Sequence, residues 1–163
     1  MTDLELQNLA NSLFFYDGEN LLWKIRQAKR LKINDIVGYS HPDGHRYVLF
    51  NGKTTGVHRI VFLLFNGFLP EEIDHIDGNG LNNKISNLRA ATKAQNQQNK
   101  KIYKNNTSGC KGISWKESKK TWIVRVQTNK NRKYIGSYKD LELAELVSIE
   151  ARNKYHKEFS RNT

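Results

Sequence analysis

Two adjacent residues, Asp74 and His75, have the side chains that hydrolysis of a phosphodiester requires. Asp74 supplies a carboxylate oxygen, which is the ligand type that Mg²⁺ prefers. His75 supplies an imidazole whose ordinary pKa lies near neutral pH, so it can take a proton from water. Neighbouring side chains of an extended segment point to opposite faces, so one could hold a metal ion while the other faces the attacking water. The pair therefore indicates metal-assisted hydrolysis; the alternative is an ordinary turn in a surface loop.

Two asparagines farther along the chain can complete this candidate site. The run Thr92-Lys93-Ala94-Gln95 is a capping box, and it predicts a helix from 93 to about 101. Asn96, early on this helix, can add an amide oxygen to the metal ion. Asn87 carries both a donor and an acceptor, so it can hold the loop against the helix.

Other polar residues near the pair have two interpretations each. His58 could assist at the active site, or it could be a packed structural histidine that follows a hairpin. Asp77 could ligate the metal ion, or it could form the turn of the Asp-Gly-Asn-Gly loop. The remaining amides are most simply interpreted as groups that stabilise this loop: Asn79, Asn82 and Asn83.

Taken in order, these residues resemble the HNH endonuclease family, and most closely its branch in bacteriophage and intron-encoded homing endonucleases. The resemblance covers roughly 13–101. It is carried by His58-Arg59, Asp74-His75-Ile76-Asp77-Gly78-Asn79, Asn82-Asn83, Asn87-Leu88-Arg89, Thr92 and the run from Asn96 to Asn99. It implies the ββα-metal fold, in which a β-hairpin and a helix hold one divalent metal ion.

The resemblance also implies a role for each of the four residues. His75 is the general base, Asp74 and Asn96 are the metal ligands, and Asn87 is the asparagine that fixes the loop. Asn96 stands where the better-known pattern has a histidine, and the phage homing branch also has asparagine there. An oxygen ligand at this position favours Mg²⁺ or Mn²⁺ over zinc, with one ion per chain.

The second half of the chain resembles a different family, the Apetala-type DNA-binding domain of plant ethylene-response factors. The similarity covers about 106–160 and is carried by Ser108-Gly109-Cys110-Lys111-Gly112-Ile113-Ser114-Trp115, Trp122-Ile123-Val124-Arg125-Val126, Tyr134-Ile135-Gly136-Ser137-Tyr138 and the stretch from Glu142 to Tyr155. It implies a three-stranded sheet that lies in the major groove and packs on one helix. An α-helix or β-ribbon fits this groove, which is about 12 Å wide.

This second resemblance implies which residues bind DNA. Those expected to face the DNA are Trp115, Lys116, Trp122 and Arg125, and those expected near phosphates are Lys111, Lys130, Arg132 and Lys133. For each of the two tryptophans, core packing is the alternative.

Turn and cap signals predict the elements that must position the candidate site. Residues 13–16 and 21–25 flank a polar four-residue loop, which is typical of a hairpin. Asn51-Gly52 separates 46–50 from 53–57, and it favours a type I′ turn, in which both central residues have positive φ. A buried helix at 58–66 is expected to end at Gly67.

The second half has its own pattern. Strands are expected at 112–117, 121–128 and 133–138, and Asp140 is expected to cap a helix from about 141 to 157. The predicted fold is therefore α+β, with an N-terminal ββα-metal nuclease module that carries extra β-hairpins. A small three-stranded antiparallel sheet packed on one helix follows it. A polar linker places the boundary between domains 1–104 and 105–163.

Charge and composition restrict the class of partner. The chain has 163 residues, 27 Lys and Arg against 16 Asp and Glu, and a net charge of +11. Residues 98–133 contain 11 of these basic residues and a single acid, Glu117. Such a block, interleaved with aromatic residues, indicates a polyanionic partner, and double-stranded DNA is expected. A second basic cluster consists of Lys24, Arg26, Lys29, Arg30 and Lys32.

Other classes of protein are disfavoured. The longest apolar run, 60–65, is far shorter than the roughly 20 residues of a membrane helix. The single cysteine, Cys110, excludes an internal disulfide and a Cys-based zinc site. We therefore expect an intracellular protein, in the cytoplasm of a bacterial host if a phage encodes it. No membrane and no obligate protein partner are expected, and the protein is expected to be a monomer or a weak dimer.

These observations together predict a metal-dependent DNA endonuclease that nicks preferred sites. One alternative is a sequence-specific DNA-binding regulator whose nuclease module is inactive. A structural basic protein that coats nucleic acid is a second alternative, and an RNA target is a variant that charge alone does not exclude.

Overall fold

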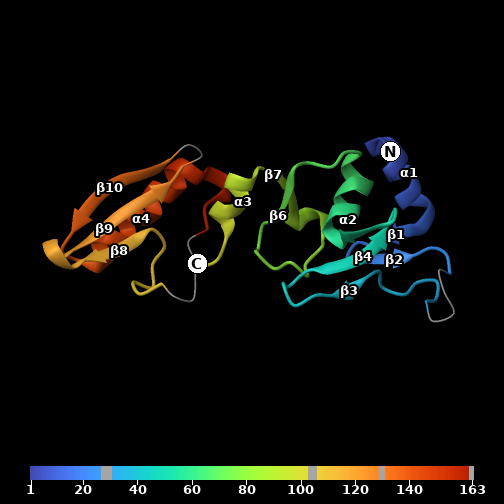
Figure 1. The fold of residues 1–163 in the computed structure, drawn as a ribbon, viewed down its shortest axis with the longest axis horizontal. Coiled ribbons are helices and arrows are strands. Elements are labelled where there is room, and N and C mark those ends of the chain that lie inside the picture. Colours follow the sequence, from blue (N-terminus) through green and yellow to red (C-terminus); the bar gives the residue numbers. More distant parts are fainter. Residues whose placement is uncertain (27–30, 103–105, 129–130, 162–163) are drawn as a thin grey trace. The chain divides into compact units, whose positions relative to one another are not determined.

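The computed structural model describes residues 1–26, 31–102, 106–128 and 131–161. The chain forms two compact units, 1–92 and 93–163, and each is described here by itself (Figure 1). No helix among the described residues is long and apolar enough to cross a membrane.

The core of the first unit forms around two helices. Helix α1 (Asp3–Leu13) begins at a capping box, in which the Glu5 backbone N–H donates to Thr2 Oγ1 and the Thr2 backbone N–H donates to Glu5 Oε2. Helix α2 (Val57–Asn66) ends at Gly67, which adopts φ +74° as the left-handed cap requires. Both helices pack on a buried cluster that includes Phe14, Leu21, Ile60 and Phe62.

Short antiparallel pairs complete the first unit. Strand β1 (Phe14–Tyr16) pairs with β2 (Leu21–Trp23), and β3 (Tyr39–Ser40), β4 (Arg46–Phe50) and β5 (Lys53–Gly56) form a sheet in that order. The β4–β5 turn has φ +49° at Asn51 and +70° at Gly52, as predicted for this pair. Strand β6 (Glu72–His75) pairs with β7 (Leu88–Ala91), and the 3₁₀ helix η1 (Ile85–Asn87) precedes β7.

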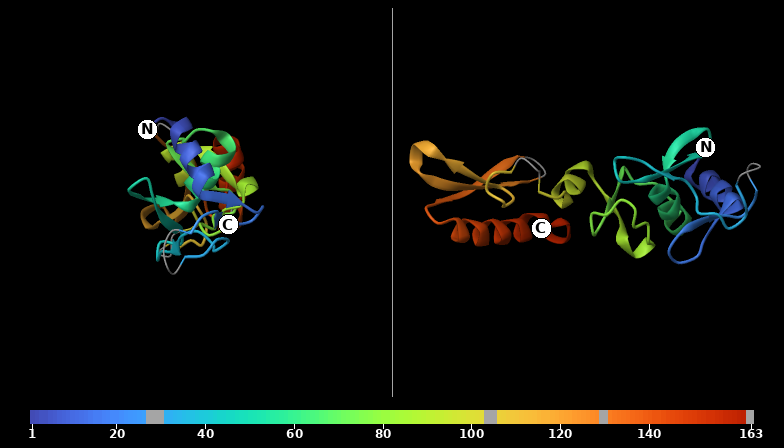
Figure 2. Two further views of the ribbon diagram at one scale, coloured as in Figure 1. Left: turned by 90° about the vertical axis from the view of Figure 1, so that its right-hand side faces the viewer. Right: turned by 90° about the horizontal axis from the view of Figure 1, so that it is seen from below.

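The second unit is one sheet covered by a helix on one face. It begins with α3 (Lys93–Asn99), and the sheet has the order β10 (Arg132–Tyr138), β9 (Thr121–Gln127), β8 (Ile113–Lys116), with η2 (Glu117–Lys119) after β8. Helix α4 (Leu141–His156) is followed by η3 (Lys157–Phe159). Figure 2, right, shows α4 (red) running along one face of the sheet.

The cap and core of α4 follow the sequence pattern. Asp140 Oδ1 accepts a hydrogen bond from the Leu143 backbone N–H at 2.7 Å, as an N-cap residue does. Ile113, Val124 and Ala144 are buried between sheet and helix. The three strands and the capped helix predicted for this half are therefore present.

The division into units differs from the predicted domain boundary. The contacts divide the chain after Thr92, so α3 belongs to the second unit. The boundary predicted between 104 and 105 lies outside the described residues, in 103–105. The predicted domains 1–104 and 105–163 stay a prediction.

The Phe14 ring gives a test of the first unit's core. Phe14 is 1% exposed, and its ring lies 4.8 Å from Trp23 and 5.9 Å from Phe50 between centroids. Phe14→Ala removes these contacts and leaves a cavity, so it should lower the free energy of unfolding by about 3–5 kcal/mol. Leu49→Ala, at a residue 69% exposed, should change it by less than about 0.5 kcal/mol. Urea denaturation measures both, and equal losses would contradict this core.

Candidate active site

The β6–β7 hairpin fixes the surroundings of the predicted metal ligand Asp74. The antiparallel register places Asp74 directly opposite Arg89, and the Asp74 side chain is 3% exposed. Arg89 Nε and Nη2 both donate to Asp74 Oδ2, at 2.8 and 2.7 Å. Removal of a charge from water is costly unless a partner compensates it, and Arg89 is such a partner for the buried Asp74 carboxylate. The sequence analysis assigned no role to Arg89.

His75 lies next to Asp74 on β6, so its side chain points to the opposite face. Its Nε2 lies 3.1 Å from Asn83 Oδ1. An amide oxygen only accepts hydrogen bonds, so Nε2 carries the proton and Nδ1 is the basic nitrogen of the neutral ring. Asn83 is buried and orients the imidazole, a more specific function than the loop stabilisation expected of it.

The environment keeps His75 neutral. Burial lowers the pKa of His75 below its ordinary value of 6.5, and it outweighs the hydrogen bond to Asn83, which raises this pKa. A neutral imidazole at neutral pH is the form that a general base needs.

Two more histidines surround the His75 ring. Centroid distances are 5.1 Å between His58 and His75, 5.5 Å between His45 and His75, and 5.5 Å between His45 and His58. Burial, followed by the nearby His75 and His45, lowers the pKa of His58 to about 3. His58 Nδ1 is buried without a hydrogen-bond partner among the described residues. His58 thus packs as a neutral ring against the candidate base, and His45, which the sequence analysis did not single out, joins it.

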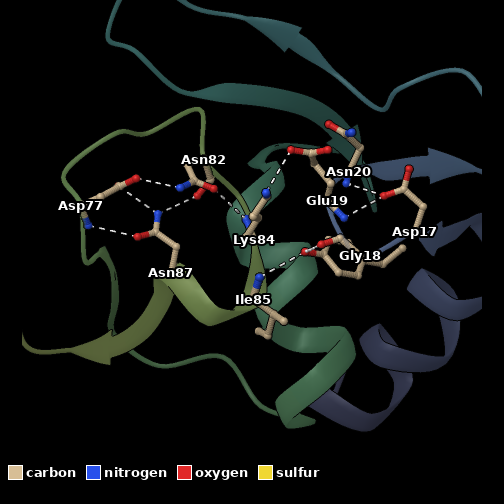
Figure 3. A network of polar contacts seen from close by, with 10 residues as sticks. Asp17, Gly18, Glu19, Asn20, Asp77, Asn82, Lys84, Ile85 and Asn87 are labelled. Atoms are coloured by element: carbon tan, nitrogen blue, oxygen red, sulfur yellow. Dashed lines mark hydrogen bonds and ion pairs between the residues drawn. The ribbon is translucent and has the colours of Figure 1, made fainter.

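Asn87 fixes the loop between β6 and β7 (Figure 3). Its Nδ2 donates to Asp77 Oδ1 at 2.9 Å and to Asn82 O at 2.8 Å, and its Oδ1 accepts from the Asp77 backbone N–H at 3.0 Å. These bonds close the loop onto the residue that precedes β7. Asn87 is therefore placed to position the loop, and its importance for catalysis stays a prediction.

Asp77 is the acceptor at the centre of the same network. It accepts from the Asn79 backbone N–H at 2.8 Å and from Asn82 Nδ2 at 2.7 Å. Burial raises the pKa of Asp77, but the hydrogen bonds from Asn79, Asn82 and Asn87 outweigh it and hold the pKa below its ordinary value. These bonds agree with the turn-forming interpretation of Asp77.

The other end of the loop is tied to the β1–β2 hairpin. Lys84 Nζ lies 3.1 Å from Glu19 Oε1, and the Ile85 backbone N–H donates to Tyr16 Oη at 3.2 Å (Figure 3). These two contacts attach the loop to the hairpin that was predicted around residues 17–20.

Asn96 belongs to the second unit. It lies on α3, five residues along the chain from Ala91, the last residue of β7. A shared metal ion between Asp74 and Asn96 stays a prediction.

The donor chemistry fits a hard divalent cation. In the described part of the chain, no group of three or more His, Cys, Asp and Glu side chains is placed to hold a metal ion. This is compatible with Mg²⁺, which binds through one or two carboxylates and substrate phosphates and keeps several waters. Asp74 would supply one such carboxylate.

The predicted DNA-binding residues separate onto two faces of the β8–β9–β10 sheet. Trp122 packs against the apolar cluster under α4, and Trp115, directly opposite it in the register, shares this covered face. Their rings lie 4.9 Å apart between centroids. Strand alternation places Lys116 and Arg125 on the uncovered face. The position of Trp122 agrees with the packing alternative, whereas Trp115 is 41% exposed, and the contact of either tryptophan with DNA stays a prediction.

The remaining predicted phosphate contacts have intramolecular partners or are exposed. Lys111 Nζ donates to Arg161 O at 3.0 Å, and Lys133 Nζ donates to Tyr155 Oη at 2.8 Å. Arg132 is exposed, and Lys130 lies outside the described residues.

Comparison with known proteins adds an independent observation. Residues 55–98 match the family model described as HNH endonuclease, and this segment contains Asp74, His75, Asn87 and Asn96. The match ends before the β8–β9–β10 sheet, so the resemblance of the second half to ethylene-response factors stays a prediction.

Two viral proteins are similar to the chain. Protein 3.8 of Escherichia phage T7 is 38% identical over 100 residues, which are 59% of this chain and 80% of that protein. An "Uncharacterized HNH endonuclease" of Acanthamoeba polyphaga mimivirus is 46% identical over 61 residues, 36% of this chain and 32% of that protein. No solved structure is significantly similar to the chain. Residues 55–98 match the family model, and the similar region covers 80% of the phage protein. The chain therefore belongs to the HNH endonuclease family.

Proposed function

We propose that this chain is a metal-dependent DNA endonuclease in which His75 is the general base. The proposal depends on one observation above all. A buried, charge-compensated Asp74 and a neutral His75 lie on opposite faces of β6, inside the segment that matches the family model. One side chain, Asp74, can therefore bind the metal ion while the other, His75, activates the attacking water.

The first chemical step belongs to the His75 ring. Asn83 Oδ1 accepts a hydrogen bond from Nε2–H, so the basic nitrogen of the ring would take a proton from water, and the hydroxide would then attack phosphorus in line. The Asn87–Asp77 network holds the loop that follows β6 and so limits movement of this ring.

Asp74 and Asn96 would together hold one Mg²⁺ or Mn²⁺ ion, whose chemistry is to neutralise charge on the phosphate and the leaving 3′ oxygen. Breakage of this bond yields a 3′-hydroxyl and a 5′-phosphate. One candidate site per chain favours nicking, and a double-strand break would need a dimer or two successive nicks.

We assign the second unit to DNA binding, which would make the enzyme site-preferring and of the homing type. Support comes from its three-stranded sheet packed on one helix and from the basic residues on the uncovered face, Lys116 and Arg125. An arginine on a sheet in the major groove can read guanine edges.

His75→Ala tests the general base. Loss of the base should lower the cleavage rate by about 10²- to 10⁴-fold, whereas DNA affinity should stay within a few-fold. Nicking of supercoiled plasmid in magnesium measures the rate, and gel shift in a chelator measures affinity. His41→Ala, at an exposed histidine of the first unit, is the matched control and should keep activity. An active His75→Ala enzyme would overturn the assignment. An inactive wild-type enzyme that binds one DNA site would favour the regulator instead.

Metal removal tests the dependence on a divalent ion. Excess chelator should abolish plasmid nicking, and Mg²⁺ or Mn²⁺ should restore it, because the two proposed ligands, Asp74 and Asn96, are oxygen donors. The ends should be substrates for a ligase that requires a 3′-hydroxyl and a 5′-phosphate. Nicking that persists in chelator would exclude the proposed mechanism.

The uncovered face of the sheet can be tested by charge removal. The double variant Lys116→Gln, Arg125→Gln should weaken DNA binding about tenfold and reduce the slope of log K against log salt by about 1 to 2. The double variant Lys139→Gln, Lys154→Gln removes the same charge from exposed positions elsewhere in this unit and should leave the slope nearly unchanged. Identical slopes for both variants would refute this binding face.

A further inference from the structure

The ring of His45 borders the candidate base, and the proposed mechanism does not use it. His45 lies in the segment 41–45 that connects β3 with β4, and its side chain is 35% exposed. Its ring centroid lies 5.5 Å from that of His75, with an angle of 58° between the ring planes. The two residues come from segments far apart in the sequence, so the fold itself brings these rings together.

Backbone hydrogen bonds fix the segment that carries His45. The His41 backbone N–H donates to His45 O at 2.8 Å, and the His45 backbone N–H donates to Asp43 Oδ1 at 3.0 Å. His45 Nδ1 is buried and has no hydrogen-bond partner among the described residues, although Asp43 Oδ1 lies 3.5 Å from it. Packing against its neighbours, rather than a hydrogen bond at Nδ1, therefore sets the position of the ring.

Gly80 of the β6–β7 loop lies directly against His45. A Cβ atom at Gly80 would lie 2.8 Å from His45 Cδ2 and Nε2 and 2.5 Å from Gly44 O, closer than Cβ atoms approach other atoms in proteins. Gly80 does not have a positive φ. The close approach of the loop to the His45 segment, rather than the backbone conformation, therefore requires glycine at this position.

The other histidine beside the base is backed in the same way. A Cβ atom at Gly56 would lie 2.5 Å from His58 Cε1 and 2.9 Å from His58 Nδ1. Gly56 has φ −65° and ψ 135°, a conformation that any residue can adopt. Both rings that contact His75 thus pack against a glycine, where a side chain would displace the ring.

Short turns in the same loop connect Gly80 to Asn83, which binds His75 Nε2. The Leu81 backbone N–H donates to Asn79 Oδ1 at 3.1 Å, and the Asn83 backbone N–H donates to Leu81 O at 3.1 Å. A displacement of Gly80 therefore moves both of its connections to the base: the His45 ring by direct contact, and Asn83 through these turns.

One hydrogen bond is not enough to fix an imidazole. The bond between His75 Nε2 and Asn83 Oδ1 holds one edge of the ring, but the ring can still rock about that bond. The neighbouring rings of His45 and His58, at centroid distances of 5.5 and 5.1 Å, restrict this movement. A base must lie within hydrogen-bond reach of the water that it deprotonates, so the orientation of this ring affects the rate.

We propose that His45 is a positioning residue for the general base and that Gly80 keeps the His45 ring in place. This inference rests on the proposed function, in which His75 takes a proton from water. His45 acts through His75 and contributes no chemistry of its own. A displacement of about 1 Å in such a site can lower the rate by about 10²-fold.

His45→Ala tests the positioning role in the full-length protein. It should lower kcat for plasmid nicking at least tenfold and change KM less than twofold, because orientation of the base acts on the transition state and not on DNA binding. His41→Ala, at an exposed residue of the same segment, is the matched control and should keep kcat within twofold. Urea denaturation verifies that both variants are folded.

A second readout does not require cleavage. The ¹³C relaxation of the ring C–H groups of His75, measured without metal, gives the order of this ring. The order should fall in His45→Ala and stay unchanged in His41→Ala. A lower kcat with an equally ordered His75 ring would mean that His45 acts on the substrate itself, and it would overturn the positioning role. Unchanged kcat and unchanged order would overturn it as well.

The ring measurement also separates this inference from the proposed function. A wild-type protein that does not cleave DNA would refute the proposed function. The order of the His75 ring would then decide the packing role alone: a loss of order in His45→Ala would support it, and unchanged order would overturn it.

Gly80→Ala tests the contact behind His45. It should lower kcat at least tenfold, whereas Leu81→Ala, at the adjacent residue that is 48% exposed, should change kcat less than twofold. In the double variant of His45→Ala and Gly80→Ala, the fold-loss should be smaller than the product of the two single losses, because both act on the position of one ring. Losses that multiply would show that the two residues act independently, and would overturn the role of Gly80.

Discussion

The pairing of β6 with β7 is the constraint on which the candidate active site depends. It places Arg89 opposite Asp74, so a carboxylate that is 3% exposed has a cation within 2.8 Å. Without that partner, the buried charge would cost several kcal/mol. The same register turns His75 to the other face, where Asn83 and two histidines surround it. A slip of one residue would exchange the two faces and separate both side chains from their partners.

The histidine that packs against His75 adds no charge beside it. Burial keeps the pKa of His58 near 3, so this ring is neutral at neutral pH. The loop from β6 to β7 contains many amides for a related reason. Asn82 and Asn87 donate to Asp77 and stabilise its charged form, and they also bond the backbone that the loop leaves unpaired.

Local signals in the sequence predicted local structure well. Asn51-Gly52, Gly67 and Asp140 each specify a backbone conformation, and the structure has the expected turn, helix end and helix start there. Helix α1 was missed, although Thr2 and Glu5 form a capping box. The partners Arg89 of Asp74 and Asn83 of His75 could not be predicted, because they depend on the β6–β7 register and on the fold of a long loop. The alternation of apolar and polar residues predicted two faces for β9, but it did not predict which face α4 covers. The sequence therefore left open whether Trp122 packs in the core, as the structure shows.

Charge is divided unevenly between the two units, as the proposed division into a DNA-binding unit and a cleaving unit would require. The first unit has 10 basic and 10 acidic residues, and the second has 17 and 6, so the net charges are 0 and +11. Sequence-independent attraction to phosphates depends on cations, so under the proposed function the second unit, with its net charge of +11, would supply the larger share of it. Attraction of that kind is the same for substrate and transition state and therefore lowers KM without raising kcat. If the proposed function holds, the first unit, whose net charge is 0, would keep Asp74 and His75 for interactions that form only in the transition state and so set the rate.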